Sequence, residues 1–495
     1  MYIEEPDATH ETTPTGYLPL RLAPSRWLAL AVLCAVTMMI ILDGTIVTVA
    51  LPSIQHALGF SATGLEWVVN GYLIAFGGLL LLAGRLGDLV GDKRVFLGGL
   101  ALFTVASLAC GLAGSQALLI AARFAQGAGG AAASAVSLGM IVALFPDPRE
   151  RATAMGVYSF VGAGGASVGL ALGGVLTQAL SWHWIFFVNL PFGIVAAVVG
   201  LRVLRAAPGI GLRAGADAAG AVLVTAGLML GVYAIAGTTA HGWVSARSLA
   251  LFGGAVVLLA GFVIRQRRAR APLLPLRVFR SRQVTVANAV QALTVAAAFG
   301  FQVLIPQYMQ RVLGYGPALA GLAMLPSAVA IAGLSIGVSA RLNARVTPAA
   351  MMACGLVPIA AGMALLLRLP SGGADTGFGT YAGYLLPTML LVGGFGLAFP
   401  AMITLAMSAA ADPSVAGATS GLFNTTQQVG AALGVAVLST LAASRTASML
   451  ATGAAPAVAL THGYHLAFTV AAGLLATAIA LTAIAFRPRA AHTAG

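Results

Sequence analysis

Asp43 and Arg123 are the two ionisable residues that fall deep inside long apolar stretches of this chain. Asp43 is the only charge in Trp27–Leu51. A charge in hydrocarbon costs at least a few kcal/mol, so such residues are candidates for a functional site. Because arginine stays protonated at any accessible pH, Asp43 is the member that can exchange a proton. The alternatives are a structural ion pair, or a carboxylate that alternates between carrying a proton and responding to a substrate or a conformational change.

The composition is that of a polytopic, all-α membrane protein. Of the 495 residues, 59% are hydrophobic and 8% are charged, whereas a soluble protein has roughly 25% charged residues. The three cysteines lie in apolar runs, and we expect no disulfide framework, metal site or cofactor. Windows of about 20 apolar residues predict fourteen transmembrane helices. They lie near residues 27–51, 67–83, 95–114, 116–145, 153–176, 185–204, 218–237, 248–264, 284–305, 317–340, 348–367, 380–404, 414–442 and 461–486.

The basic residues are distributed asymmetrically about these spans. Of 26 Lys and Arg, 21 fall on one side of the predicted membrane, four on the other, and Arg123 inside span 4. This is the positive-inside rule with both termini cytoplasmic. The net charge of +13 is therefore topological, and no nucleic-acid partner is expected. Of the 26 basic residues only Lys93 is a lysine, which is expected of a GC-rich genome, so we expect the inner membrane of a bacterial cell.

On this topology the two deep charges lie at matching depth. Asp43 comes about nine residues before the outer end of span 1, and Arg123 about seven after the outer start of span 4. At 1.5 Å per residue these positions are roughly 13 and 10 Å below the outer surface. We therefore predict that they pair within one six-span unit, which lowers the cost of each charge.

The longest basic loop, about Arg265–Arg282, falls after span 8 and leaves spans 9–14 as a second six-span unit. Two six-helix bundles flanking a central cavity are a known transporter plan, and spans 7 and 8 are then an inserted hairpin. The predicted parts are a cytoplasmic tail (1–26), an N-terminal bundle (27–205), the hairpin (206–265), a basic cytoplasmic linker (266–283), a C-terminal bundle (284–486) and a second cytoplasmic tail (487–495).

The loop 84–94 has the most specific spacing in the chain. Its glycines at 84, 87 and 91 permit a tight interhelical turn with backbone against backbone. Asp88 can cap a neighbouring helix or pair with a cation, and so form a latch that breaks when two halves rock. The residues predicted for this gating latch are Gly84, Asp88, Gly91 and Arg94. The alternative is an ordinary solvated loop.

This loop resembles the signature of the major facilitator superfamily between spans 2 and 3. Residues 42–52 resemble the first-span motif of its fourteen-span drug:proton antiporter branch, and 123–127 resemble the span-4 motif of that branch. Segments 182–191, 272–277 and 421–425 also match, so the resemblance covers the chain after about residue 27. It implies the major-facilitator-type fold, and it implies that Asp43 and Arg123 take part in proton coupling.

The sequence also departs from the family pattern. Leu170 stands where the span-5 antiporter motif has proline, so a kink site is missing. Leu89 and Asp92 replace basic residues in the loop, and Thr48 replaces an asparagine. Gln427 and Gln428 occupy a stretch where many relatives carry arginine, so coupling would rest on the N-terminal half.

Several amides fall within spans and are candidates for a substrate cavity, although an interhelical hydrogen bond is an equal alternative for each. Glu66 lies at the outer mouth of span 2. The predicted cavity residues are Asn70, Gln126, Gln291, Asn424, Gln427 and Gln428.

The pattern as a whole favours a secondary exporter of amphiphilic drugs or antibiotics, driven by proton antiport through alternating access. The expected partners are a small amphiphilic organic substrate, protons and the lipid bilayer, and the protein is expected to be a monomer. Uptake or facilitated diffusion of a metabolite without proton coupling is the alternative, and Leu170 is its best support. An intramembrane enzyme would need a convergent nucleophile or metal set, and the sequence shows none.

Overall fold

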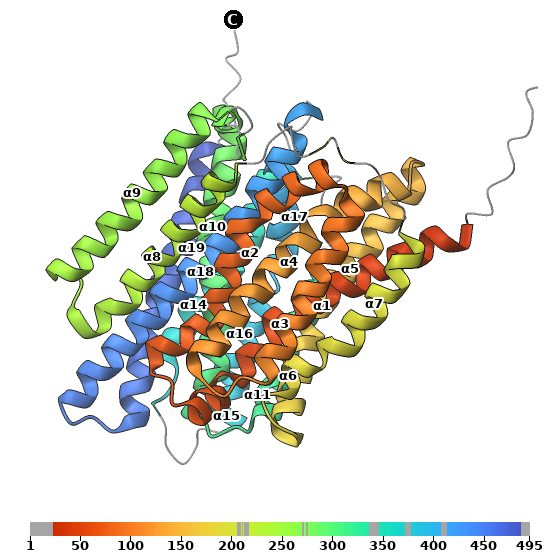
Figure 1. The fold of residues 1–495 in the computed structure, drawn as a ribbon. Coiled ribbons are helices and arrows are strands. Elements are labelled where there is room, and N and C mark those ends of the chain that lie inside the picture. The colour runs from red at the N-terminus through yellow and green to blue at the C-terminus, as the bar shows by residue number, and fades with distance from the viewer. Residues whose placement is uncertain are drawn as a thin grey trace, which may run out of the picture.

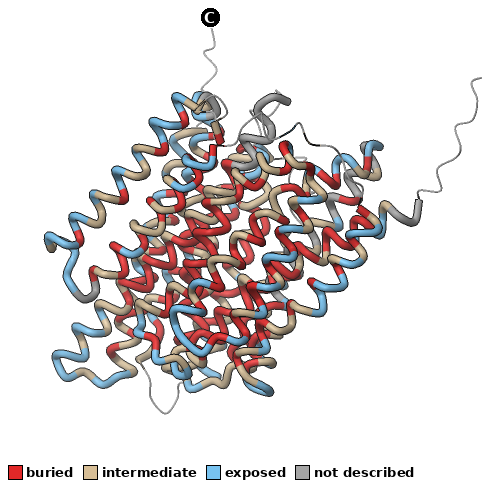
Figure 2. The backbone as a smooth tube through the Cα atoms, in the orientation of Figure 1, coloured by how far each residue is buried: buried red, intermediate tan, exposed pale blue. Residues whose placement is uncertain are grey.

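The protein is a bundle of long helices, as the computed structural model shows (Figure 1). The structure describes residues 23–204, 209, 211, 217–269, 272–273, 276–335, 346–371, 378–406 and 413–486. Among these residues there is no β-strand. Buried residues are concentrated in the middle of the bundle (Figure 2). Many large apolar residues are nevertheless exposed on its surface.

The first seven helices pack mainly on one another. They are α1 (Ala23–Leu58), α2 (Ala62–Val90), α3 (Asp92–Gly111), α4 (Gln116–Leu144), α5 (Pro148–Ala179), α6 (Trp184–Phe187) and α7 (Asn189–Val203). Here α1 contacts α5 and α7, while α4 contacts both α2 and α3. Ser61 and Ser115 cap α2 and α4 by accepting the N–H of Gly64 and Leu118, which places the start of each helix. We call this group the N-terminal helices.

A second group, the C-terminal helices, follows residue 282. It comprises α10 (Arg282–Arg311), α11 (Pro317–Ala323), α12 (Leu325–Gly333), α14 (Pro348–Leu365), the short turns η4 (Leu366–Arg368), α15 (Phe378–Thr380) and η5 (Tyr381–Leu385), then α16 (Leu386–Val392), α17 (Phe395–Ala406), α18 (Pro413–Ala451) and α19 (Pro456–Ala485). Before them lies η2 (Leu276–Arg280). The segment predicted as one span over 380–404 is divided, because a π-turn precedes Pro387 and the Gly393–Gly394 pair separates α16 from α17.

Between the two groups lie α8 (Ala218–His241) and α9 (Ala246–Arg268). The first packs against α2 and α18, whereas α9 packs on α8 at the periphery (Figure 1). Asp217 caps α8 and accepts hydrogen bonds from Gly220 N–H at 2.9 Å, Gln266 at 2.7 Å and Arg265 at 2.5 Å. Burial acts to raise the pKa of Asp217, yet these donors outweigh it and lower the pKa below the usual range. The carboxylate therefore stays charged and joins the two helices.

Twelve helices in the described part of the chain are long and apolar enough to cross a membrane. The sequence predicted fourteen. The two remaining predicted spans, near 153–176 and 317–340, coincide with the shorter apolar stretches Val168–Ala179 and Pro317–Gly333. Part of the second prediction, along with the predicted terminal tails, lies outside the described residues.

Several close contacts between the N-terminal and C-terminal helices lie at the end that carries the α1–α2 turn, at the bottom of Figure 1. We call this the outer end, as the charge distribution predicts. Gln310 donates to the Val49 carbonyl at 2.9 Å, and Arg311 donates to the Gln55 side chain. Deeper in the same interface, a Cβ on Gly174 would lie 2.3 Å from the Pro317 carbonyl oxygen. The outer end is therefore closed by backbone packed against backbone.

Candidate functional site

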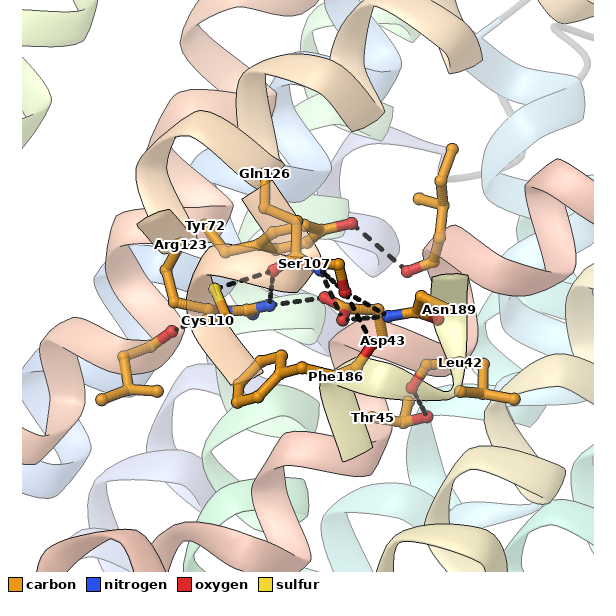
Figure 3. Close-up of polar contacts among 12 residues, drawn as sticks. Leu42, Asp43, Thr45, Tyr72, Ser107, Cys110, Arg123, Gln126, Phe186 and Asn189 are labelled. Atoms are coloured by element: carbon orange, nitrogen blue, oxygen red, sulfur yellow. Dashed lines mark hydrogen bonds and ion pairs between the residues drawn. The ribbon is translucent and has the colours of Figure 1, made fainter. Parts of the chain in front are cut away.

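Asp43 and Arg123 form a buried ion pair, as their matching depths predicted (Figure 3). Arg123 Nη1 lies 2.5 Å from Asp43 Oδ2, and the two side chains are 1% and 0% exposed. Removing one partner from such a pair leaves an uncompensated charge, at a cost of about 3–5 kcal/mol. The pair is thus a strong local constraint between α1 and α4.

Two amides complete the coordination of the carboxylate. Gln126 Nε2 donates to Asp43 Oδ1 at 2.8 Å, and Asn189 Nδ2 donates to the same oxygen at 2.9 Å. An ionised carboxylate is an acceptor only, and here every neighbour is a donor. The arrangement therefore fits the deprotonated form of Asp43. A proton on the carboxyl would displace one of these donors.

A serine organises the two amides. Ser107 Oγ accepts from Gln126 at 3.1 Å and from Asn189 at 3.0 Å, and it donates to the Phe186 carbonyl at 2.9 Å. The break between α6 and α7 at Val188 places Phe186 and Asn189 on either side of this serine. The short α6 segment thus supplies both an anchor for Ser107 and a ligand for Asp43.

Arg123 also holds α2. Its Nε donates to the Val68 carbonyl at 2.8 Å, and its guanidinium carbon lies 4.4 Å from the centroid of the Tyr72 ring. The approach depends on Gly127, where a Cβ would lie 2.3 Å from the Tyr72 carbonyl oxygen. Any larger residue would separate α4 from α2 and draw the arginine away. Gly127 therefore allows α4 to pack closely against α2 and keeps Arg123 within reach of Val68 and Tyr72.

Sequence reasoning missed two members of this cluster. Asn189 lies in the segment 182–191, whose resemblance to the family was noted without a role for the asparagine. Ser107 carries no signal, because a lone serine in an apolar helix usually bonds to its own backbone. Gln126 was predicted to line a substrate cavity. Here it is fully buried and bonded to both members of the ion pair.

The loop predicted as a latch is a tight turn, as expected. Gly91 has φ of 101°, a conformation that favours glycine, and its N–H donates to the Gly87 carbonyl at 2.8 Å. Asp88 pairs with Arg85 at 3.6 Å, with its side chain 62% exposed. Arg94 is exposed one turn into α3. The predicted close approach is wrong at Gly84, where the nearest atom to an added Cβ would be 4.0 Å away.

The remaining predicted cavity residues fall into two kinds. Asn70 and Gln291 are fully buried, and neither amide has a hydrogen-bond partner in the described ranges. Unsatisfied buried amides are costly, so both are suited to a ligand or water. On α18, Asn424, Gln427 and Gln428 are half-buried, and the Gln428 Cβ lies 2.6 Å from where a Cβ on Gly77 would be. This last residue therefore packs between α18 and α2.

Comparison with known proteins gives a consistent result. Residues 33–435 match the model of the Major Facilitator Superfamily. The chain is 39% identical over 480 residues to the puromycin resistance protein pur8 of Streptomyces alboniger, covering 95% of this chain and 94% of that protein. It is also 39% identical over 422 residues to the cephamycin export protein CmcT of Amycolatopsis lactamdurans, covering 84% and 85% of the two chains.

Among solved structures, a bacterial homologue of the human lysosomal transporter Spinster, in an inward-facing and unoccupied conformation, superposes with a TM-score of 0.66. The two chains are 16% identical, and the match covers 93% of this chain and 97% of that one. At this level of identity the likeness describes the fold.

Proposed function

Since the chain belongs to the major facilitator superfamily, we propose that it is a secondary exporter of amphiphilic drugs or antibiotics that exchanges them for protons. The names of its relatives, which include a puromycin resistance protein and a cephamycin export protein, support the substrate class. The observation that carries the coupling is the sealed Asp43–Arg123 pair, a titratable group with a fixed counter-charge inside a transporter.

In the proposed cycle, Asp43 alternates between two states. While ionised, it holds Arg123, Gln126 and Asn189 as donors. When it takes up a proton, its attraction for Arg123 falls, and the grip of Arg123 on the Val68 carbonyl and the Tyr72 ring is released. Because α2 also packs against α18, a shift of α2 changes the contact between the two groups of helices. Protonation of Asp43 thus favours one of two packings of α2 against its neighbours. Such a shift between two conformations is what couples proton uptake to transport.

The proposed topology has fourteen spans, arranged as two six-helix bundles with α8 and α9 as an inserted hairpin, and with both termini cytoplasmic in a monomer. The packing of α1 on α5, of α4 on α2 and α3, and of α10 on α18 and α19 supports this division. The tight outer end and the buried pair support an outward-closed state, in which substrate would enter from the cytoplasm. With leucine at position 170, α5 is one continuous helix. It nevertheless lies close to α11, because a Cβ on Gly321 of α11 would lie 2.3 Å from the Leu170 carbonyl oxygen.

The function is tested with purified protein in proteoliposomes. When the lumen and the bath differ in pH, we expect transport of puromycin against its concentration gradient. Protons should move in the opposite direction at a rate proportional to puromycin transport. A facilitator without coupling, the alternative that Leu170 favours, would show counterflow that is indifferent to the pH gradient. Exchange of a neutral substrate for one proton moves one net charge across the membrane. The free energy that drives this exchange would therefore change by about 2.3 kcal/mol for each 100 mV of membrane potential.

Asp88→Ala is expected to lower turnover several-fold while leaving the apparent affinity for substrate within twofold of wild type. The exposed Asp88–Arg85 pair contributes only about 0–1 kcal/mol to stability, so a loss of turnover would not come from unfolding. The measurement is initial efflux rate against substrate concentration. Unchanged turnover would rule out a latch at Asp88, and Asp147→Asn, at an exposed cytoplasmic carboxylate, serves as the control.

A further inference from the structure

A second polar site lies at the outer end, away from the Asp43–Arg123 pair. A cavity of about 240 Å³ opens there between α1 and α2 on one side and α10, α18 and α19 on the other. Its polar lining is Glu66, Gln307, Arg311, Ser439, Thr446 and Tyr464. The rest of the wall is apolar. The cavity has room for several waters or for the charged end of an amphiphilic molecule.

Glu66 is the unusual residue in this cavity. It is 5% exposed, and neither carboxylate oxygen has a hydrogen-bond partner among the residues that the structure describes. The two other buried carboxylates in the described part of the chain, Asp43 and Asp217, are each held by an arginine and an amide. Arg311 lines the same cavity but donates to Gln55, and it forms no ion pair with Glu66 among the described residues. Among the described residues, no basic side chain therefore lies within ion-pair distance of Glu66.

Helix geometry separates this site from the coupling pair. At about 100° per residue, Glu66, Asn70 and Gly77 lie within about 40° of one another on α2, whereas Val68 and Tyr72 lie on the opposite face. Those two residues contact Arg123. Helix α2 therefore separates the two sites, with the Asp43–Arg123 pair on one face and Glu66 on the opposite face.

The Glu66 face of α2 meets α18. Gly77 packs on Gln428, and the two helices contact each other with opposite chain directions. Counting eleven residues toward the outer end from each member of this contact reaches Glu66 on α2 and Ser439 on α18. Both line the cavity, and Ser439 Oγ also lacks a hydrogen-bond partner within the described part of the chain. Unpartnered acceptors therefore face one another across the interface that opens and closes in the proposed cycle.

We infer that Glu66 binds the positively charged amine of a substrate in the outer cavity. A carboxylate with two free oxygens accepts the N–H groups of an ammonium ion, and Ser439 offers a further acceptor. The apolar walls formed by Leu51, Leu65 and Leu304 suit the hydrophobic body of the same molecule. The inference rests on the proposed export function, since it places this site on the way out of the protein.

The test uses two fluorescent probes that share the dansyl body and the five-carbon chain: dansylcadaverine, which ends in a charged primary amine, and its N-acetyl derivative, which ends in a neutral amide. Binding is titrated by dansyl fluorescence with full-length protein in nanodiscs, without any proton gradient. Wild type is expected to bind the amine more tightly than the amide. Glu66→Gln should weaken amine binding by about tenfold or more, the usual worth of a charge-assisted hydrogen bond, and leave amide binding within twofold.

A control makes the result specific. Asp147→Asn removes a carboxylate at the cytoplasmic surface and should change neither affinity. Equal binding of both probes by wild type, or equal weakening of both by Glu66→Gln, would each overturn the inference. Because binding is read without a gradient, failure of proton coupling would leave this result intact.

Discussion

Asp43→Asn is expected to reduce pH-driven efflux to the level of protein-free liposomes, while counterflow of substrate at equal pH persists. Asparagine keeps the size of the side chain but cannot exchange a proton. The donors Gln126 and Asn189 retain an oxygen to bond to, so the local geometry is largely preserved. The measurement is efflux with an imposed pH gradient, beside counterflow in the same vesicles.

This variant also leaves the Arg123 charge buried without its partner, at a cost of about 3–5 kcal/mol in stability. A double variant, Asp43→Asn with Arg123→Gln, removes both charges and should recover most of the thermal stability of wild type. If coupling stays absent in the stable double variant, loss of the proton site is the cause. Wild-type coupling in Asp43→Asn would remove Asp43 from the mechanism.

Gly174→Leu is expected to hold the outer end open and to stop export. A Cβ at this position would lie 2.3 Å from the Pro317 carbonyl oxygen and 2.9 Å from the Ala318 Cα, and both are backbone atoms that cannot rotate away. Overpacking of this kind costs about 1–3 kcal/mol. Since the clash exists only when the end is closed, the balance of closed and open states should shift by about 5–150-fold.

The shift can be read with a cysteine at Gln307, which is 8% exposed and lines the outer cavity. In a background that lacks the three native cysteines, a membrane-impermeant maleimide should label position 307 faster in Gly174→Leu than in its absence. Gly98→Leu is the matched control, because no atom lies within 4 Å of an added Cβ there. Equal labelling with normal export would show that the α5–α11 contact does not close the transporter.

The sequence was informative where one chemical property dominated. Apolar length predicted the twelve helices of the described chain that are long enough to cross a membrane, and two further spans that are not confirmed. The depth of Asp43 and Arg123 predicted a pair that the structure confirms. Both predictions follow from the bilayer. Its thickness sets the length of a helix that crosses it, and its low polarity makes an unpaired ion inside it unfavourable in free energy. Neither prediction depends on how the helices are arranged around one another.

What remained hidden depends on the packing of helices distant in sequence. Ser107 and Asn189 are 82 residues apart, and their bond through α3 and α7 has no local signature. Glu66 lies near the predicted interface, where a glutamate facing water is ordinary. Only the assembled α1, α2, α10, α18 and α19 show that its carboxylate is enclosed. The division of α16 from α17 likewise follows from close contact with α14, where a Cβ on Gly394 would lie 2.3 Å from the Gly355 carbonyl oxygen.

The complete burial of Asp43 has a consequence for the energy balance of the cell. Its side chain is 0% exposed, and protein donors bond to both of its oxygens. Under the proposed coupling, a copy in this closed conformation would not leak protons across the membrane, because solvent has no contact with the carboxylate. The cell could then keep many copies ready without dissipating its proton-motive force, and protons would cross only when the helices around Asp43 move apart during transport.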